Sequence, residues 1–493
     1  MSITALDVLT EMERRGIRVA AEGENLSVDA PKGAVDAALR DQIVAHKAGL
    51  LALLREPDAP FPLTAGQQAL WYQHTLDAGG YAYTIGFAAH LSDPIDLGIL
   101  DRALCALVER HSQLRTRVFA DGDTPLQEIM PPPARVLTVH DGPLSRQDRE
   151  DAALAAYKTP LALDVPVQLR AQVWPGDGEV TLLLTLPHIA IDGQSLWALL
   201  DAIPTVYQRI AAGEPPFDSP APAPYARHVQ EQNAAPHDTA WAYWQKALAD
   251  LPDPMDFPFD LPRPKRQRFD GGAVQDTLPE ALVEDIRACA RRHGVTPYVV
   301  LLSVFHIVLH KQAQAQDILI GSPFSGRTRA AFDATLGYFV NPLPVRARIT
   351  PETSCADLFA EVAQAARDAL DHQDMPLPDM ITRLGLPRDP SRPPLFQTSF
   401  AFQSAGAATP LARGMMRGTQ GQAIDWKGFS AAIIPLPQQE GLFDLTLEVL
   451  QDDARYDIAL KYNASLLSSS TASSLLSQFI EGLRGVVGGV GCV

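Results

Sequence analysis

Hydrophobic and polar positions along this chain follow two different periods, which predicts a mixed α/β protein. Residues 180–186 form an uncharged, β-rich run, typical of a strand buried on both faces. Other short apolar runs predict strands at residues 84–91, 167–173, 318–320, 398–402 and 445–450. A helical period predicts helices at residues 97–111, 195–211, 239–248, 281–293 and 296–312. Residues 213–224, which are rich in proline, and residues 253–268 interrupt this order and are expected to be irregular.

The first sixty residues have a pattern of their own. Thr4 is placed to cap an amphipathic helix, and Gly16 is placed to end it. Residues 17–28 then alternate between apolar and polar around a short turn, which predicts a β-hairpin. Residues 1–57 are therefore expected to form a small separate domain with a free sheet edge, followed by a linker at residues 56–60.

Length and charge narrow the possible functions. A chain of 493 residues exceeds what one hydrophobic core usually organises, so two or three domains are expected. The formal net charge of −17 argues against a nucleic-acid partner, because such binding depends on clustered Lys and Arg. The densest basic cluster, residues 263–268, is interpreted as a solvated loop, and contact with an anionic partner or its phosphate is the alternative.

Neither a signal peptide nor a run of membrane-spanning length is visible, so no membrane partner is expected. Histidines 306 and 310 stand four residues apart on an apolar helix, a spacing that can hold zinc. No third ligand is indicated, so they are interpreted as a partly buried helix face and no metal is expected. Four scattered cysteines without ligand spacing favour free thiols and a cytoplasmic location: Cys105, Cys289, Cys355 and Cys492.

The residues that follow the run at 180–186 carry the candidate chemistry. His188 comes directly after the predicted strand, and Asp192 and Gly193 lie in the next turn. A neutral imidazole can accept a proton near pH 7 from an attacking amine or hydroxyl. A glycine allows close approach of its backbone and can offer an N–H to a developing oxyanion. For this motif alone, the alternative is a histidine at the edge of the core that backbone groups satisfy.

Further motifs stand in a fixed order along the chain. They are FPLTAGQQALW at 61–71, RHSQLRTRVF at 110–119, GR at 326–327, GYFVNPLPVR at 337–346, HQDMP at 372–376 and RPPLFQ at 392–397. With the segment around His188, this series resembles the condensation domains of nonribosomal peptide synthetases over about residues 58–485. Their His-His-x-x-x-Asp-Gly loop supplies the catalytic group through its second histidine, which corresponds to His188. Pro187 stands where the first histidine is usual, and this is a departure from the pattern.

The resemblance implies an α/β fold with two lobes similar to chloramphenicol acetyltransferase, at residues 58–235 and 236–493. The lobes would form a V with a tunnel between them. The N-terminal domain is similar to the β-hairpin docking domains of assembly-line synthetases, which capture a short C-terminal segment of the preceding protein. Arg14, Arg15 and Arg18 beside the hairpin would favour an acidic segment. A simple stabilising cap on the next domain is the alternative.

The same resemblance assigns roles at the site. His188 would position the nucleophile and take its proton, and backbone N–H near Gly193 would stabilise the oxyanion. A Ser-His-Asp triad with Ser195 is rejected, because Ser195 lies on the following helix and no Gly-x-Ser-x-Gly elbow occurs. Asp192 would instead hold the loop by pairing with an arginine, and the sequence leaves three candidates open: Arg327, Arg115 and Arg110.

Absent motifs bear on the substrate. The chain has no adenylation signature, no carrier attachment site and no Gly-rich phosphate loop. Its substrate is therefore expected to arrive already activated, as a thioester on the phosphopantetheine arm of a partner acyl or peptidyl carrier protein, and no bound cofactor is expected.

The acceptor is expected to be a soluble small molecule. The chain begins with Met1 and stops soon after the last helix of the resemblance, as in stand-alone, chain-releasing enzymes such as the ester-forming condensation enzyme of enacyloxin assembly. The expected function is release of an acyl or polyketide chain onto a hydroxyl as an ester. Amide formation between two carrier-bound substrates is the first alternative. An epimerisation domain and a non-catalytic recruitment module are two others.

Overall fold

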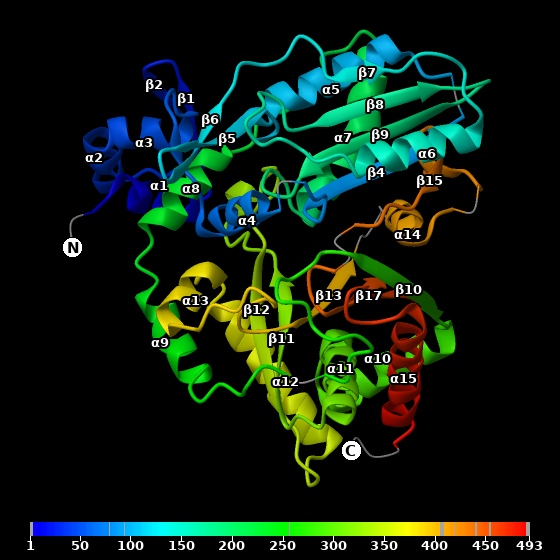
Figure 1. Cartoon of the computed structure of the whole chain (residues 1–493). Helices are drawn as coiled ribbons and strands as arrows, with labels where there is room; N and C mark the ends of the chain where they lie inside the picture. The colour runs from blue at the N-terminus through cyan, green and yellow to red at the C-terminus, as the bar shows by residue number, and fades with distance from the viewer. Residues whose placement is uncertain are drawn as a thin grey trace.

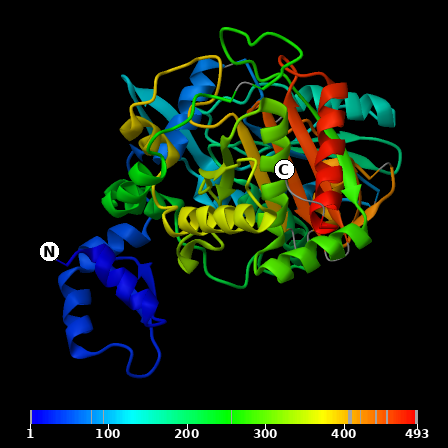
Figure 2. The same ribbon diagram turned by 90° about the horizontal axis from the view of Figure 1, so that it is seen from below.

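The computed structural model describes residues 3–77, 79–92, 94–255, 257–404, 409–419, 421–438, 441–452 and 455–489. Two lobes lie one above the other, each built on a mixed sheet, and a small N-terminal domain packs at one side (Figure 1). Seen from below, this domain projects from one corner of the molecule (Figure 2). The expected α/β fold of two lobes preceded by a small domain is confirmed.

The N-terminal domain contains the predicted hairpin between three helices. Thr4 caps the first helix through a reciprocal pair of hydrogen bonds with Asp7, and Gly16 has a φ of +70° where the chain leaves it. The strands of the hairpin pair antiparallel, from Arg18 opposite Asp29 to Glu22 opposite Asn25. The elements are α1 (Ala5–Arg14), β1 (Arg18–Glu22), β2 (Asn25–Asp29), α2 (Ala37–Ala45) and α3 (Lys47–Leu54).

The first lobe surrounds the strand that leads to His188. Its sheet has the order β14-β15-β4-β9-β8-β7, and β4 and β9 at its centre are almost wholly buried because helices cover both faces. The strands are β4 (Thr84–Leu91), β7 (Leu137–Val139), β8 (Arg170–Pro175), β9 (Val180–Pro187), β14 (Ile424–Trp426) and β15 (Phe429–Ile434). The helices are α4 (Ala65–Leu76), α5 (Leu97–Arg110), α6 (Arg146–Tyr157) and α7 (Gly193–Ala211). A smaller sheet beside them comprises β3 (Phe61–Pro62), β5 (Thr116–Asp121) and β6 (Thr124–Ile129).

The second lobe has a sheet of the order β10-β17-β16-β13-β11-β12. Its strands are β10 (Gly271–Leu278), β11 (Asp317–Phe324), β12 (Asn341–Arg348), β13 (Thr398–Ser404), β16 (Leu445–Gln451) and β17 (Tyr456–Asn463). Its core helices are α10 (Glu280–His293), α11 (Pro297–Ala313), α12 (Cys355–Asp371) and α15 (Ser469–Val487). The remaining helices are α8 (Tyr225–Ala234), α9 (Asp238–Ala247), α13 (Leu377–Leu384) and α14 (Thr409–Arg417).

One segment crosses from the second half of the chain into the first lobe. Strand β15 pairs antiparallel with β4, with Ala431 opposite Leu91, and β14 extends the same sheet. Trp426 is buried in the first lobe's core and donates its indole N–H to the carbonyl of Leu200 at 2.9 Å. The hydrophobic pattern of the sequence did not foretell this crossing.

The helices and strands predicted from the sequence occur in the structure, with bounds that differ by a few residues. The strand expected at 167–173 begins later, as β8, and the helix expected at 195–211 begins at Gly193. Among the described residues, no single helix combines the length and apolarity needed to cross a membrane, and α10 with α11 reaches the threshold only as a pair bent by 100°. In the same residues no cluster of three or more His, Cys, Asp or Glu could hold a metal.

The cysteine prediction needs a correction. Cys105 and Cys289 are free thiols, but Cys355 is disulfide-bonded, so the expectation of free thiols throughout is wrong. Cys492 lies outside the described residues. Scattered spacing says nothing about which residues a fold brings together, and for that reason the sequence could not show the bond. One argument for a cytoplasmic location is thereby lost, and that location stays a prediction.

His306 is a core residue, and His310 is only partly buried. Nδ1 of His306 lies 2.9 Å from the carbonyl oxygen of Leu302, and Nε2 lies 3.3 Å from that of Val345. Burial lowers the pKa of His306 from 6.5 to about 4. His306 is therefore protonated below pH 6.5 in the unfolded chain but only below about pH 4 in the folded chain.

The stabilisation linked to His306 is present in full above pH 6.5 and is lost as the pH falls towards 4. Between pH 7 and pH 5 we expect His306 to remove roughly 2 kcal/mol from the free energy of unfolding. Urea unfolding of the wild type and His306→Gln at both pH values measures this. The variant should lose less stability on acidification by about that amount, and equal losses would refute the expectation.

Candidate active site

The end of strand β9 holds His188 in a fixed place. Its backbone N–H donates to the carbonyl of Tyr83 at 2.8 Å, and the chain then turns, with the N–H of Ala190 on the carbonyl of Pro187. Nδ1 of the ring lies 2.8 Å from the carbonyl oxygen of Ile191, so Nδ1 carries the proton in the neutral form and Nε2 keeps its lone pair. The residue is only 9% exposed, and burial lowers its pKa below 6.5. His188 is therefore neutral at pH 7 and able to accept a proton.

A pocket that is partly open to solvent lies against His188. Its lining combines apolar residues, among them Leu70, Leu161 and Leu163, with polar ones, which are Gln73, His74, Asp77, Tyr83 and Thr84. Burial lowers the pKa of His74, and burial and the nearby charge of Asp270 raise that of Asp77. The combination of apolar walls and a few polar groups suits a small-molecule substrate. A tunnel open at both ends stays a prediction.

Asp192 makes its polar contacts with helix α7 and with the second lobe. It caps helix α7 by accepting the N–H of Ser195 at 2.8 Å, and it also accepts the N–H of Phe339 at 3.1 Å. Nη1 of Arg327 lies 2.8 Å from its Oδ2, and the two side chains are only 2% and 3% exposed. Of the three candidate arginines, Arg327 is thus the one that pairs with Asp192.

The other two arginines lie elsewhere. Arg115 makes an ion pair with Glu56 at 2.9 Å and donates to the carbonyl of Met130 at 2.7 Å. Arg110 donates to the carbonyls of Ser219 and Pro220. The expected place for Arg115 beside Asp192 is therefore not what the structure shows: Arg115 is committed to the segment that joins the N-terminal domain to the first lobe.

Ser195 connects the two lobes by hydrogen bonds. Its hydroxyl donates to the carbonyl of Gly337 at 3.0 Å and accepts from Nη2 of Arg327 at 2.6 Å. It is buried and fully engaged, which agrees with the rejection of a serine nucleophile. Gly193 is the first residue of α7, and the N–H groups of a first helical turn lack partners inside the helix. It is exposed, and a side chain there would meet nothing within 4 Å.

Tyr338 is a residue whose place at the site sequence reasoning missed. Its ring meets the His188 ring edge to face, with centroids 5.3 Å apart. Its carbonyl accepts the hydroxyl of Tyr225 at 2.6 Å, and a Cβ at Gly66 would lie 2.7 Å from its ring. Tyr338 belongs to the motif at 337–346, but nothing in the local sequence of that motif indicates that Tyr338 packs on His188.

The arginines beside the hairpin differ in their freedom. Arg14 pairs with Glu11 at 2.7 Å, and Arg15 pairs with Glu11 and with Asp36. These two arginines lower the pKa of Glu11 to about 2. Arg18 lies exposed on β1 and has no ion-pair partner within the described part of the chain. Of the three, Arg18 is the one with its charge free for an acidic partner.

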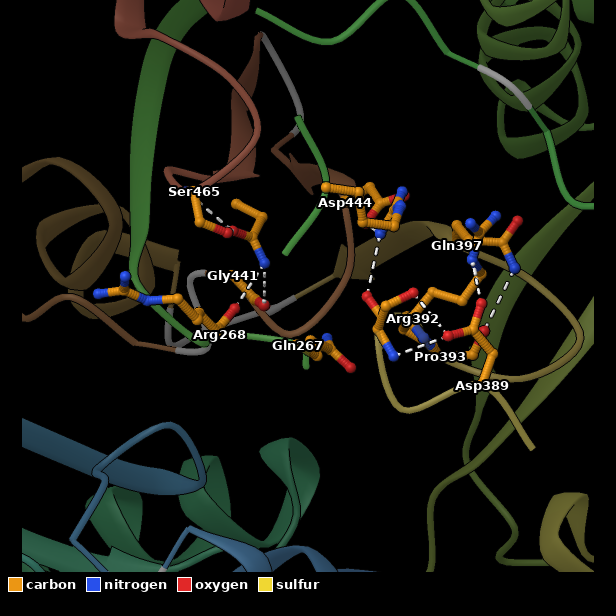
Figure 3. A network of polar contacts seen from close by, with 12 residues as sticks. Gln267, Arg268, Asp389, Arg392, Pro393, Gln397, Gly441, Asp444 and Ser465 are labelled. Atoms are coloured by element: carbon orange, nitrogen blue, oxygen red, sulfur yellow. Dashed lines mark hydrogen bonds and ion pairs between the residues drawn. The ribbon is translucent and has the colours of Figure 1, made fainter. Parts of the chain in front are cut away.

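A polar network fixes the irregular segments of the second lobe (Figure 3). Arg263 makes a two-pronged ion pair with the buried Asp444, at 2.5 and 3.0 Å. The solvated-loop interpretation therefore fails for Arg263, while Lys265, Arg266 and Arg268 are exposed. Gln397 donates to the carbonyl of Pro393 at 3.2 Å and so ties down its own loop (Figure 3). Phe269 follows Arg268 in the chain, and its ring packs edge to face on that of Tyr83, which lines the pocket at His188, with the ring centroids 6.0 Å apart.

Comparison with known proteins defines the class. Residues 59–489 match the condensation domain family, and residues 7–56 match the TubC N-terminal docking domain. The chain therefore belongs to the condensation domain family, whose members catalyse acyl transfer. Those of nonribosomal peptide synthetases act on substrates tethered to phosphopantetheine.

Individual relatives agree with this class. Tyrocidine synthase 2 of Brevibacillus parabrevis is 30% identical over 87% of this chain, and polyketide synthase PksN of Bacillus subtilis is 27% identical over 85%. The chain spans only 12% and 8% of these relatives. The X-domain from teicoplanin biosynthesis has the same fold, with a TM-score of 0.78 at 21% identity, and the match covers 89% of this chain and 97% of the X-domain.

Proposed function

We propose that this protein transfers an acyl or polyketide chain from the phosphopantetheine thioester of a partner carrier protein to the hydroxyl of a soluble acceptor, and so releases the chain as an ester. The observation that carries the proposal is His188: it lies in the wall of a cavity, with Nδ1 bonded to Ile191 and Nε2 left as a base.

In the proposed reaction His188 is the base. Nε2 of His188 takes the hydroxyl proton as the oxygen attacks the thioester carbon. A backbone N–H near Gly193 stabilises the oxyanion of the tetrahedral intermediate. The intermediate collapses, the C–S bond breaks, and the imidazolium returns its proton to the thiolate of the carrier arm. The products are an ester and a free carrier thiol, and His188 ends as it began.

The choice of a hydroxyl rests on what the site offers. An amine can attack with its lone pair and needs chiefly positioning, whereas a hydroxyl gives up its proton in the step and depends on a base. A buried imidazole that is neutral at pH 7 suits the second case. Amide formation between two carrier-bound substrates remains the alternative, because the same His188 could position an amine.

The carrier is proposed to reach the site through the N-terminal domain. Hairpin β1–β2 forms a sheet of its own in the described residues, so its outer edges can add an extended peptide from the carrier's C-terminus. The exposed Arg18 favours an acidic sequence in that peptide.

Intact-mass spectrometry of the acylated carrier tests the function. The carrier is incubated with the protein and with matched alcohol and amine acceptors, and the loss of its acyl group is followed together with the product. We expect deacylation that depends on the alcohol and gives an ester. Transfer only to an amine would favour the alternative, and exchange of the α-proton without transfer would indicate an epimerase. Without acceptor-dependent deacylation the catalytic proposal fails, and recruitment is the function left.

A further inference from the structure

The N-terminal domain meets the catalytic lobes through buried charges. Arg227 on α8 is 2% exposed, and its Nη2 lies 2.7 Å from Oε1 of Glu13 on α1. Its Nε lies 2.8 Å from Oε1 of Glu231, one turn further along α8. A buried guanidinium needs such partners, because an uncompensated charge is costly in a low-dielectric surrounding. Helix α8 lies beside the N-terminal domain (Figure 1).

A second arginine joins the same carboxylates. Arg329 lies 3.2 Å from Glu231 and 3.5 Å from Glu13, and it donates to the hydroxyl of Thr10 on α1 at 2.7 Å. Thr10, Glu13, Arg227, Glu231 and Arg329 form what we call the junction cluster. It connects α1, α8 and the segment 326–340 of the second lobe.

The junction cluster is close to the groups that hold His188. Arg327, two residues before Arg329, makes the buried pair with Asp192 and lies 4.1 Å over the ring of Phe339. Arg227 lies 5.3 Å over Phe332, whose ring contacts Phe339 at 5.7 Å. From α8, the hydroxyl of Tyr225 bonds the carbonyl of Tyr338, the residue that packs on His188.

The end of the domain is fixed as well. Glu56, which follows α3, makes its ion pair with Arg115 at 2.9 Å, and Arg115 is largely buried. The domain is thus held at α1 and at its exit.

We infer that Glu13 is a positioning residue for the acyl transfer, and that the N-terminal domain is part of the catalytic unit as well as a device for capturing a carrier. Glu13 holds Arg227 and Arg329, so that segment 326–340 keeps Arg327 on Asp192 and Tyr338 on His188. This inference rests on the proposed transfer reaction at His188.

The test uses Glu13→Gln in the full chain, which keeps the shape of the side chain and removes its charge. With an acylated carrier that lacks its C-terminal docking segment, we expect kcat to fall about tenfold, because small displacements of catalytic groups are costly, while KM for the carrier stays the same. Asp41→Asn is the matched control: it neutralises an exposed carboxylate on α2 and should leave kcat unchanged. Hydrogen exchange of amides 335–340 should also be faster in Glu13→Gln than in the wild type.

A double-mutant cycle with Asp192→Asn separates positioning from general damage. If Glu13 acts through the Asp192 pair, the two losses in kcat will not add, whereas independent effects multiply in rate. An unchanged kcat in Glu13→Gln, or a fully multiplicative cycle, would overturn the inference. If instead the wild type transfers no acyl group to any acceptor, the proposed function fails. In that case, unchanged exchange at amides 335–340 would overturn the structural part.

Discussion

Replacing His188 with alanine is expected to reduce acyl transfer to a hydroxyl acceptor by about 10²- to 10⁴-fold, the range that general-base catalysis commonly supplies. The reason is the fixed tautomer: Ile191 holds Nδ1–H, and Nε2 is the atom left to take the proton. The rate of ester formation under single-turnover conditions, followed by intact mass of the carrier, measures the effect.

The pH profile provides the matching evidence. Because burial lowers the pKa of His188 below 6.5, the wild-type rate should rise with pH only below that value and be level above it. The variant should lose this acid limb. His310→Ala, which removes an imidazole from α11 in the second lobe, serves as control and should keep both rate and profile. Activity of His188→Ala within threefold of the wild type would remove its catalytic role.

Arg327→Ala is expected to be the most damaging change to the framework of the site. It leaves the carboxylate of Asp192 buried without its partner, and breaking a buried pair in this way typically costs about 3–5 kcal/mol of unfolding free energy. It also removes the hydrogen bond from Arg327 to the hydroxyl of Ser195, so the lobes lose two contacts at once. Urea unfolding, together with the transfer rate, measures both consequences.

A double variant tests this explanation. Combining Arg327→Met with Asp192→Asn removes both charges while an amide oxygen can still cap α7 at Ser195. If the cost comes from the stranded charge, the double variant should recover more than half of the stability that Arg327→Ala loses. A loss below about 1 kcal/mol in the single variant would mean that the pair contributes no more than a surface ion pair does.

The sequence predicted what depends on local pattern. Strand β9 and helix α7 were expected from periodicity, and the place of His188 between them follows directly. Which arginine pairs with Asp192 was left open, because Arg327 is 135 residues away and only the packing of the lobes selects it. Tyr338 was missed for the same reason.

The sequence also could not predict which strands pair or which surface arginines already have ion-pair partners. An apolar run shows that a strand exists but not which edge it joins, so the crossing of β15 to β4 could not be seen. Arg14 and Arg15 looked available to a partner, but they already form ion pairs with Glu11 and Asp36. The resemblance to condensation domains supplied the class, and the geometry supplied the contacts within it.

The crossing strand has a practical consequence for those who exchange parts between assembly lines. A splice placed between the two halves, near residue 235, would provide a donor's first half without the edge strand that completes its sheet. The row of backbone groups along β4 would then face a strand chosen for another neighbour. Chimeras of this enzyme should therefore carry residues 424–434 from the same parent as residues 84–91, even though more than three hundred positions separate them.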